Sequence, residues 1–264
     1  MNARRVVRSA AAVADRLLPT PEGLVVLIYH RVGGDSDSAV DLPTDTFRAQ
    51  MELLAQWGTV LPLHQAVGAL RRGDRPTGVV ITFDDGAADF CTTAVPIMRN
   101  LQLPSTLYLV TSAPDTGSLP WGVPAASWGA LREATADGLV DVQSHTHRHT
   151  LLHHTTATAA ADELDRSIDA ISQQLGAAPV HFAYPKAVPG NRAARAAVAA
   201  RFQSAALAGH RVNTAASQLQ RLGRVPILRA DSTSTFAVKA GGGLRVEGIA
   251  RHLYGRVRYR SSVT

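Results

Sequence analysis

Short apolar runs rich in β-branched residues alternate with helical patterns along most of this chain, and this alternation restricts the folds that it can adopt. The runs that read as strands are residues 24–29, 78–83, 105–111, 139–143, 180–184 and 204–208. Helical periodicity predicts helices over residues 44–57, 94–101, 162–175 and 193–200. Strands that alternate with helices in this way form a parallel sheet or a (β/α) barrel, and both keep their active sites at the strand C-termini.

The length of the chain, 264 residues, suits one large α/β domain. A hydrophobic content of 45% and a charged content of 18% are ordinary for a protein that buries a normal core. We therefore expect one main domain over residues 21–240. A basic helix or arm over residues 1–20 would precede it, and a basic tail over residues 241–264 would follow.

Positive charge is concentrated at the two ends of the chain. Lys and Arg number 27 against 21 Asp and Glu, which gives a net charge of +6. The terminal arginines are Arg4, Arg5, Arg8, Arg245, Arg251, Arg256, Arg258 and Arg260. They read either as solvated tails or as a surface that meets an anionic membrane or glycan carrier. Because no aromatic-plus-basic ladder or helix-turn-helix signature accompanies them, we expect no nucleic-acid partner.

The cysteine content and the N-terminus bear on location. Cys91 is the single cysteine, so no internal disulfide can form, as is usual in a reducing compartment. The apolar run at residues 10–14 is shorter than a secretory signal requires, and no run is long enough to span a membrane. We therefore expect a cytoplasmic protein, with an amphipathic face in residues 6–17 that would suit peripheral membrane contact.

The segment Thr82-Phe83-Asp84-Asp85-Gly86 places two carboxylates at the end of an apolar strand. Neighbouring side chains of a strand point to opposite faces, but at a strand end both can lean into one site. Two acids this close raise each other's pKa unless a cation neutralises them, and a metal ion is the natural neutraliser. The alternative reading is a simple Asp-Gly turn with a helix-capping aspartate.

A second polar segment is His145-Thr146-His147-Arg148-His149. Histidines at positions i and i+4 lie on one face of a helical turn, so His145 and His149 can converge on one ion. Two imidazoles and one carboxylate leave coordination positions open, which is typical of a catalytic zinc site. His147 is expected to be exposed, and the alternative for the whole cluster is a surface tract that binds metal adventitiously.

Together the two segments resemble the polysaccharide deacetylase family, also known as the NodB homology domain or carbohydrate esterase family four. The resemblance covers roughly residues 24–236 and implies a distorted, NodB-like (β/α) barrel with about seven strands, formed by residues 21–240. It implies that Asp84 is the general base and that Asp85, His145 and His149 bind a divalent metal ion. Zn²⁺ suits these ligands best, and Co²⁺ or Mn²⁺ would also fit.

Further segments resemble a subgroup of this family. Residues 27–32 match its LIYHRV-type first strand, which would place His30 near the metal at the barrel mouth. Phe182-Ala183-Tyr184-Pro185 resembles the segment that walls the site, with the backbone N–H of Lys186 facing the oxyanion. The segment over residues 224–227 resembles the strand that closes the barrel. Trp121, Trp128, Tyr184 and Pro185 are our candidates for contact with the sugar.

Two departures from the family pattern bear on function. Ala183 stands where family members often carry an arginine that holds the catalytic aspartate, and no late L-x-H motif supplies a general acid. His30 or His210 could replace that acid. The resemblance implies removal of acetyl groups from an N-acetylated glycan or a lipid-linked sugar. The alternatives are a non-catalytic carbohydrate-binding domain and an esterase that acts on O-acetyl groups.

Overall fold

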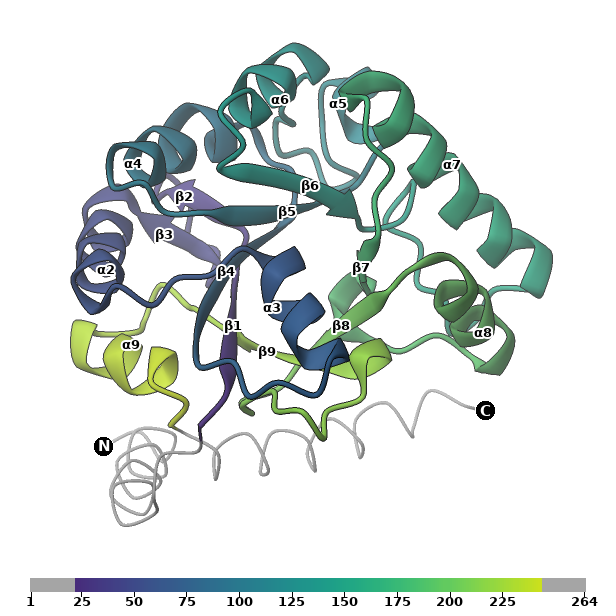
Figure 1. Cartoon of the computed structure of the whole chain (residues 1–264). Helices are drawn as coiled ribbons and strands as arrows, with labels where there is room; N and C mark the ends of the chain where they lie inside the picture. The colour runs from purple at the N-terminus through teal and green to yellow at the C-terminus, as the bar shows by residue number, and fades with distance from the viewer. Residues whose placement is uncertain (1–21, 244–264) are drawn as a thin grey trace, which may run out of the picture.

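The computed structural model describes residues 22–243, which form the barrel shown in Figure 1. The N-terminal arm predicted over residues 1–20 and all but the first three residues of the predicted basic tail lie outside the described residues. Within the described part, no helix has both the length and the apolar composition to cross a bilayer.

Seven parallel strands close the barrel in the order β1-β4-β5-β6-β7-β8-β9, which confirms the predicted (β/α) barrel. Their bounds are β1 Leu24–Tyr29, β4 Gly78–Asp85, β5 Ser105–Leu109, β6 Val140–Ser144, β7 His181–Ala183, β8 Ser204–Ala208 and β9 Leu222–Pro226. The first strand pairs with β4 on one side and with β9 on the other. The two ends of the domain therefore meet at β1, and this junction brings β9 within reach of β4.

The helices surround the barrel (Figure 1). They are α2 Thr44–Trp57, α3 Leu63–Arg71, α4 Val95–Asn100, α5 Ala113–Thr116, α6 Trp128–Thr135, α7 Ala157–Leu175, α8 Arg192–Arg201 and α9 Thr233–Ala240. Short turns at Phe90–Ala94, Pro185–Ala187 and Leu219–Arg221 and a two-stranded sheet of β2 Arg31–Gly33 and β3 Asp41–Pro43 complete the fold. The sequence patterns predict α2, α4, α7 and α8, whereas α3, α5, α6, α9 and the small sheet were not expected.

Alternate residues of β1 pack into two different hydrophobic cores, because successive side chains of a strand point to opposite faces. Val25 and Leu27 pack outward in the core formed with α2, α4, α6 and α9. Val26 points inward and packs with Val67 and Leu70 of α3. Helix α3 therefore supplies the apolar side chains that fill one end of the barrel, and the polar chemistry lies at the strand C-termini.

Asn213 joins the strands at the junction where the barrel closes. Its backbone exchanges two hydrogen bonds of 2.8 Å with Leu24. Its side-chain amide accepts from the Gly223 N–H at 2.8 Å and donates to the Gly223 carbonyl at 2.8 Å. The side chain is buried, so removing it leaves polar backbone groups of β9 without a partner.

We expect Asn213→Ala to lower the free energy of unfolding by about 2–4 kcal/mol, because the two Gly223 groups lose their hydrogen bonds in a dry environment. Urea denaturation followed by circular dichroism measures this change. Asn100→Ala is the matched control, since Asn100 is exposed at the end of α4. Equal stability of the two variants would contradict the role given to Asn213.

Candidate functional site

A cavity of about 320 Å³ opens at the C-terminal end of the barrel strands. It is lined by Ile28, His30, Asp84, Asp85, Trp121, His145, His149, Lys186, Ala187, Ala208 and Pro226. All four residues of the two polar sequence segments that we singled out, two aspartates and two histidines, therefore reach one cavity.

Asp84 follows the alternation of β4 and points into the barrel, where it meets Arg224 of β9. Both carboxylate oxygens of Asp84 accept hydrogen bonds from this guanidinium, at 2.6 and 2.8 Å. Arg224 is fully buried, and its second contact is the Thr82 hydroxyl at 3.2 Å. Burial favours the neutral acid, but the charge and hydrogen bonds of Arg224 outweigh it and lower the pKa of Asp84 to about 2.

Asp85 reaches the same cavity because its backbone leaves the extended conformation. Strand alternation would send its side chain to the opposite face from Asp84. Its φ of 77° lies in the left-handed region, so the chain turns within the last residue of β4. Burial and the neighbouring charge of Asp84 raise the pKa of Asp85 to about 8, which leaves this carboxyl in need of a cation.

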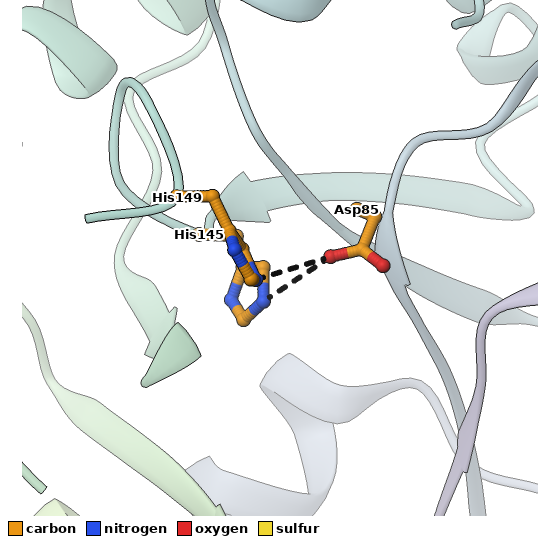
Figure 2. Close-up of side chains that lie close together, drawn as sticks. All are labelled: Asp85, His145 and His149. Atoms are coloured by element: carbon orange, nitrogen blue, oxygen red, sulfur yellow. Dashed lines mark ion pairs between the residues drawn. The ribbon is translucent and has the colours of Figure 1, made fainter. Parts of the chain in front are cut away.

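His145 and His149 converge on Asp85, as Figure 2 shows. The Nε2 atoms of His145 and His149 lie 3.6 and 3.5 Å from Oδ1 of Asp85. The helical turn that we expected here is wrong, because residues 145–149 form an irregular loop in which Thr146 and His149 have φ values of 68° and 60°. Left-handed residues cannot continue a right-handed helix, and the loop instead folds the two rings together.

Contacts from two elements hold this loop. The backbone N–H of Arg148 donates to Glu163 of α7 at 2.9 Å. The carbonyl of His147 accepts from the N–H of Ser112 at 2.9 Å. The hydroxyl of Thr146 accepts from the backbone of Thr150 at 3.1 Å. These bonds offset the left-handed backbone, which costs about 1–3 kcal/mol per non-glycine residue.

Asp85, His145 and His149 fit a divalent metal ion. Each offers one ligand atom, and these atoms lie within 4.8 Å of one another. Nδ1 of His145 lies 2.8 Å from the carbonyl of Ala183, which can only accept, so this nitrogen carries the proton and Nε2 presents its lone pair to Asp85. Burial lowers the pKa of His145 to about 4 and that of His149 to about 3, which keeps both imidazoles neutral and able to ligate.

His30 and Lys186 also line the cavity. Nδ1 of His30 is buried and has no hydrogen-bond partner among the described residues, and burial lowers its pKa. Lys186 is exposed at the cavity and adopts a φ of 52°, followed by Ala187 at 54°. His210 does not line the cavity, so within the described residues His30 is the better placed of the two candidate acids.

The candidate sugar contacts divide into two groups. Trp121 lines the cavity, is 48% exposed, and meets the ring of His149 edge-on at a centroid distance of 4.9 Å. Trp128 is buried in the core and donates from Nε1 to Asp115 at 2.8 Å. Tyr184 and Pro185 are buried beside the cavity rather than in its lining. Of the four, the structure brings only Trp121 to the cavity.

Arg224 is the residue whose role the sequence did not reveal. We read it as part of the strand that closes the barrel, and we took Ala183 as the loss of an arginine contact to Asp84. The structure supplies that contact from β9 instead. The available signal was an arginine inside an otherwise apolar strand, where a buried charge requires a partner.

A model of the polysaccharide deacetylase family matches residues 71–205. Among curated proteins, the poly-β-1,6-N-acetyl-D-glucosamine N-deacetylases of two Escherichia coli strains are 30% identical over an alignment of 141 residues that covers 47% of this chain. The match spans about a fifth (20%) of the length of those proteins.

Solved structures share the fold. The Streptococcus pyogenes deacetylase PplD aligns with a TM-score of 0.76 at 23% identity, covering 84% of this chain and 99% of that chain. IcaB from Ammonifex degensii aligns with a TM-score of 0.71 at 23% identity, covering 84% and 98%. At this identity the two structures establish the barrel fold.

We expect the unmodified protein to bind a divalent metal ion and purified His145→Ala to lose it, because one of the three proposed ligands is removed. Elemental analysis of dialysed protein measures this. His147→Ala is the matched control: His147 bonds to Thr111 at 3.0 Å and does not line the cavity. Metal retained by His145→Ala at the level of the control would reject the ligand assignment.

Metal binding should release protons in a pH-dependent way. Asp85 has a pKa raised to about 8, so the metal-free protein is protonated there at pH 7 and must lose that proton to ligate. The histidines are already neutral at pH 7 and release none. Titration calorimetry with Zn²⁺ in buffers of different ionisation enthalpy should show about one proton released at pH 7 and none at pH 9.

The apparent affinity should correspondingly rise with pH up to about 8 and then level off. Asp85→Asn provides the comparison, because an amide binds metal poorly and has no proton to lose. Proton release that is the same at pH 7 and pH 9 would contradict the protonation state given to Asp85.

Proposed function

Because this chain belongs to the polysaccharide deacetylase family, we propose that it is a metal-dependent hydrolase that removes acetyl groups from N-acetylated sugars and releases acetate. One observation carries the proposal. At the end of a single strand, Asp85 faces two neutral imidazoles, while the neighbouring Asp84 accepts hydrogen bonds from Arg224. One carboxylate is thus available as a ligand and the other as a base.

The substrate class is supported by the curated relatives. The Escherichia coli proteins are named for N-deacetylation of poly-β-1,6-N-acetyl-D-glucosamine. Because the match spans a fifth (20%) of those proteins, we propose for this chain only part of their substrate. That part is the N-acetylglucosamine unit with its amide bond, and not the polymer. An N-acetylated glycan and a lipid-linked sugar both present that unit.

Hydrolysis of an acetamide requires an activated water, a stabilised oxyanion and a proton for the leaving amine. A divalent cation, with Zn²⁺ the best match to one carboxylate and two imidazoles, supplies Lewis acidity when bound and polarises the acetyl carbonyl. Asp85, His145 and His149 would hold it. Their neutral rings and the single ligand carboxylate leave positions open for substrate.

Asp84 is assigned as the general base. Its two oxygens accept from Arg224, so the carboxylate is oriented and remains ionised at neutral pH. Oδ2 of Asp84 lies 4.0 Å from Nε2 of His145, which places the base beside the proposed ligands. A water molecule between Asp84 and the proposed ligands would pass a proton to Asp84 while the oxygen of that water attacks the acetyl carbon.

Lys186 and His30 are assigned to the two remaining tasks. The backbone N–H of Lys186 follows Pro185 at the cavity wall and would stabilise the oxyanion. His30 lines the cavity outside the ligand triplet, and it would take up the proton that Asp84 removes from the water and pass it to the nitrogen of the leaving amine. Trp121 offers its exposed face to the sugar ring.

Removal of O-acetyl groups is the second candidate activity. An alcohol leaves with less help from an acid than an amine does, and His30 is the one cavity-lining histidine of the described residues outside the ligand triplet. Comparing acetate release from N-acetyl and O-acetyl forms of one oligosaccharide separates the two activities. Binding of both without release would favour the non-catalytic alternative.

We expect Asp84→Asn to keep its metal but to lower kcat for acetate release by about 100- to 10,000-fold, the usual contribution of a positioned base. The amide can still bond to Arg224 through its oxygen, so the fold should persist. Asp169→Asn, an exposed carboxylate on α7, is the control. An Asp84→Asn enzyme as fast as that control would show that another group accepts the proton.

A further inference from the structure

Lys186 presents an unpaired positive charge to the cavity. It is exposed, it lines the cavity, and within residues 22–243 its ammonium forms no ion pair. The cavity also contains the carboxylates of Asp84 and Asp85. Here both carboxylates are directed elsewhere, one to Arg224 and the other to the two histidines.

Other cations around the site are already neutralised. Arg224 is bound by Asp84, and Arg31 contacts Asp89 at 2.9 Å. Arg148 lies 3.6 Å from Glu163. Among the described residues that line the cavity, Lys186 is therefore the one lysine or arginine, and its ammonium is not paired with a carboxylate.

The backbone at Lys186 is strained and fixed. Lys186 and Ala187 have consecutive left-handed φ values of 52° and 54°, a conformation that side chains other than glycine rarely adopt. The N–H of Ala187 donates to the Tyr184 carbonyl at 2.8 Å, and that of Val188 donates to the Pro185 carbonyl at 3.1 Å. A tight turn rather than a mobile loop therefore carries the lysine, and backbone strain of this kind clusters at functional sites.

Trp121 and Lys186 line the same cavity as the proposed ligand His149. The ring of Trp121 meets the ring of His149 edge-on. A sugar whose acetyl group reaches His149 would thus meet an aromatic face and an ammonium at once. The aromatic face suits a sugar ring, and the ammonium suits a negative group attached to that ring or to its neighbour.

We infer that the cavity selects N-acetylated sugars that carry an anionic group next to the reacting residue, and that the Lys186 ammonium binds this group. The inference rests on the proposed function and narrows its substrate class. A carboxylate of an acidic neighbouring sugar and a phosphate on the reacting sugar share this chemistry.

Two matched substrate pairs test the inference. The first compares N-acetylglucosamine linked to glucuronic acid with N-acetylglucosamine linked to glucose. The second compares N-acetylglucosamine 1-phosphate with the methyl glycoside. The quantity measured is the ratio of kcat/KM for the charged substrate to that for the neutral one, in the metal-loaded enzyme, in Lys186→Met and in Lys186→Arg.

Both variants keep the backbone N–H, so a change in the ratio isolates the side-chain charge whatever happens to the absolute rate. We expect a ratio of about five in the unmodified enzyme for at least one pair, the upper range for a solvent-exposed ion pair. The ratio should reflect a lower KM for the charged substrate. It should fall toward one in Lys186→Met and in high salt, and it should persist in Lys186→Arg. The pair that shows it identifies the anion as carboxylate or phosphate.

A ratio near one for both pairs in the unmodified enzyme, or a ratio that survives in Lys186→Met, would overturn the inference. If no substrate releases acetate, the proposed function fails, and calorimetric binding of the same four sugars decides the inference separately. Tighter binding of a charged sugar that disappears in Lys186→Met would uphold it, and equal binding by both proteins would overturn it.

Discussion

Two adjacent carboxylates at the end of one buried strand form the constraint on which this site depends. Neither can remain ionised in such surroundings unless a cation faces it, since an unpaired buried charge costs several kcal/mol. Asp84 is neutralised by Arg224, a residue 140 positions further along the chain. Closure of the barrel places β9 next to β1 and β1 next to β4, so the fold itself brings this arginine to the aspartate. Within residues 22–243 no arginine or lysine pairs with Asp85, and we assign this carboxylate to the proposed metal ion.

Backbone strain gathers where the proposed chemistry lies. Six non-glycine residues of the described part of the chain have positive φ, and five of them are cavity residues or belong to the histidine loop: Asp85, Thr146, His149, Lys186 and Ala187. The histidine loop is held by a hydrogen bond from its Arg148 N–H to Glu163 and by one from the Ser112 N–H to its His147 carbonyl. The strands therefore stabilise the fold, and the loops that follow them orient the proposed ligand atoms.

The sequence predicted the parts of the molecule that follow from local pattern. Apolar runs located six of the seven barrel strands, and the two polar segments led to Asp85, His145 and His149, which lie together in the structure. Features that depend on distant contacts were missed or misread. The helical turn proposed for the histidines ignored loop strain, and the contact of Arg224 with Asp84 follows from closure of the barrel. Trp128 is a candidate for sugar contact in the sequence but packs in the core.

A crystal structure of metal-soaked protein, with anomalous scattering recorded on both sides of the zinc absorption edge, tests the central claim most directly. The account predicts one zinc peak within coordination distance of Asp85, His145 and His149, with Asp84 still held by both nitrogens of Arg224. A zinc peak coordinated by Asp84, or zinc bound only at histidines outside the cavity, would contradict the assignment of Asp85 as a metal ligand and of Asp84 as the general base.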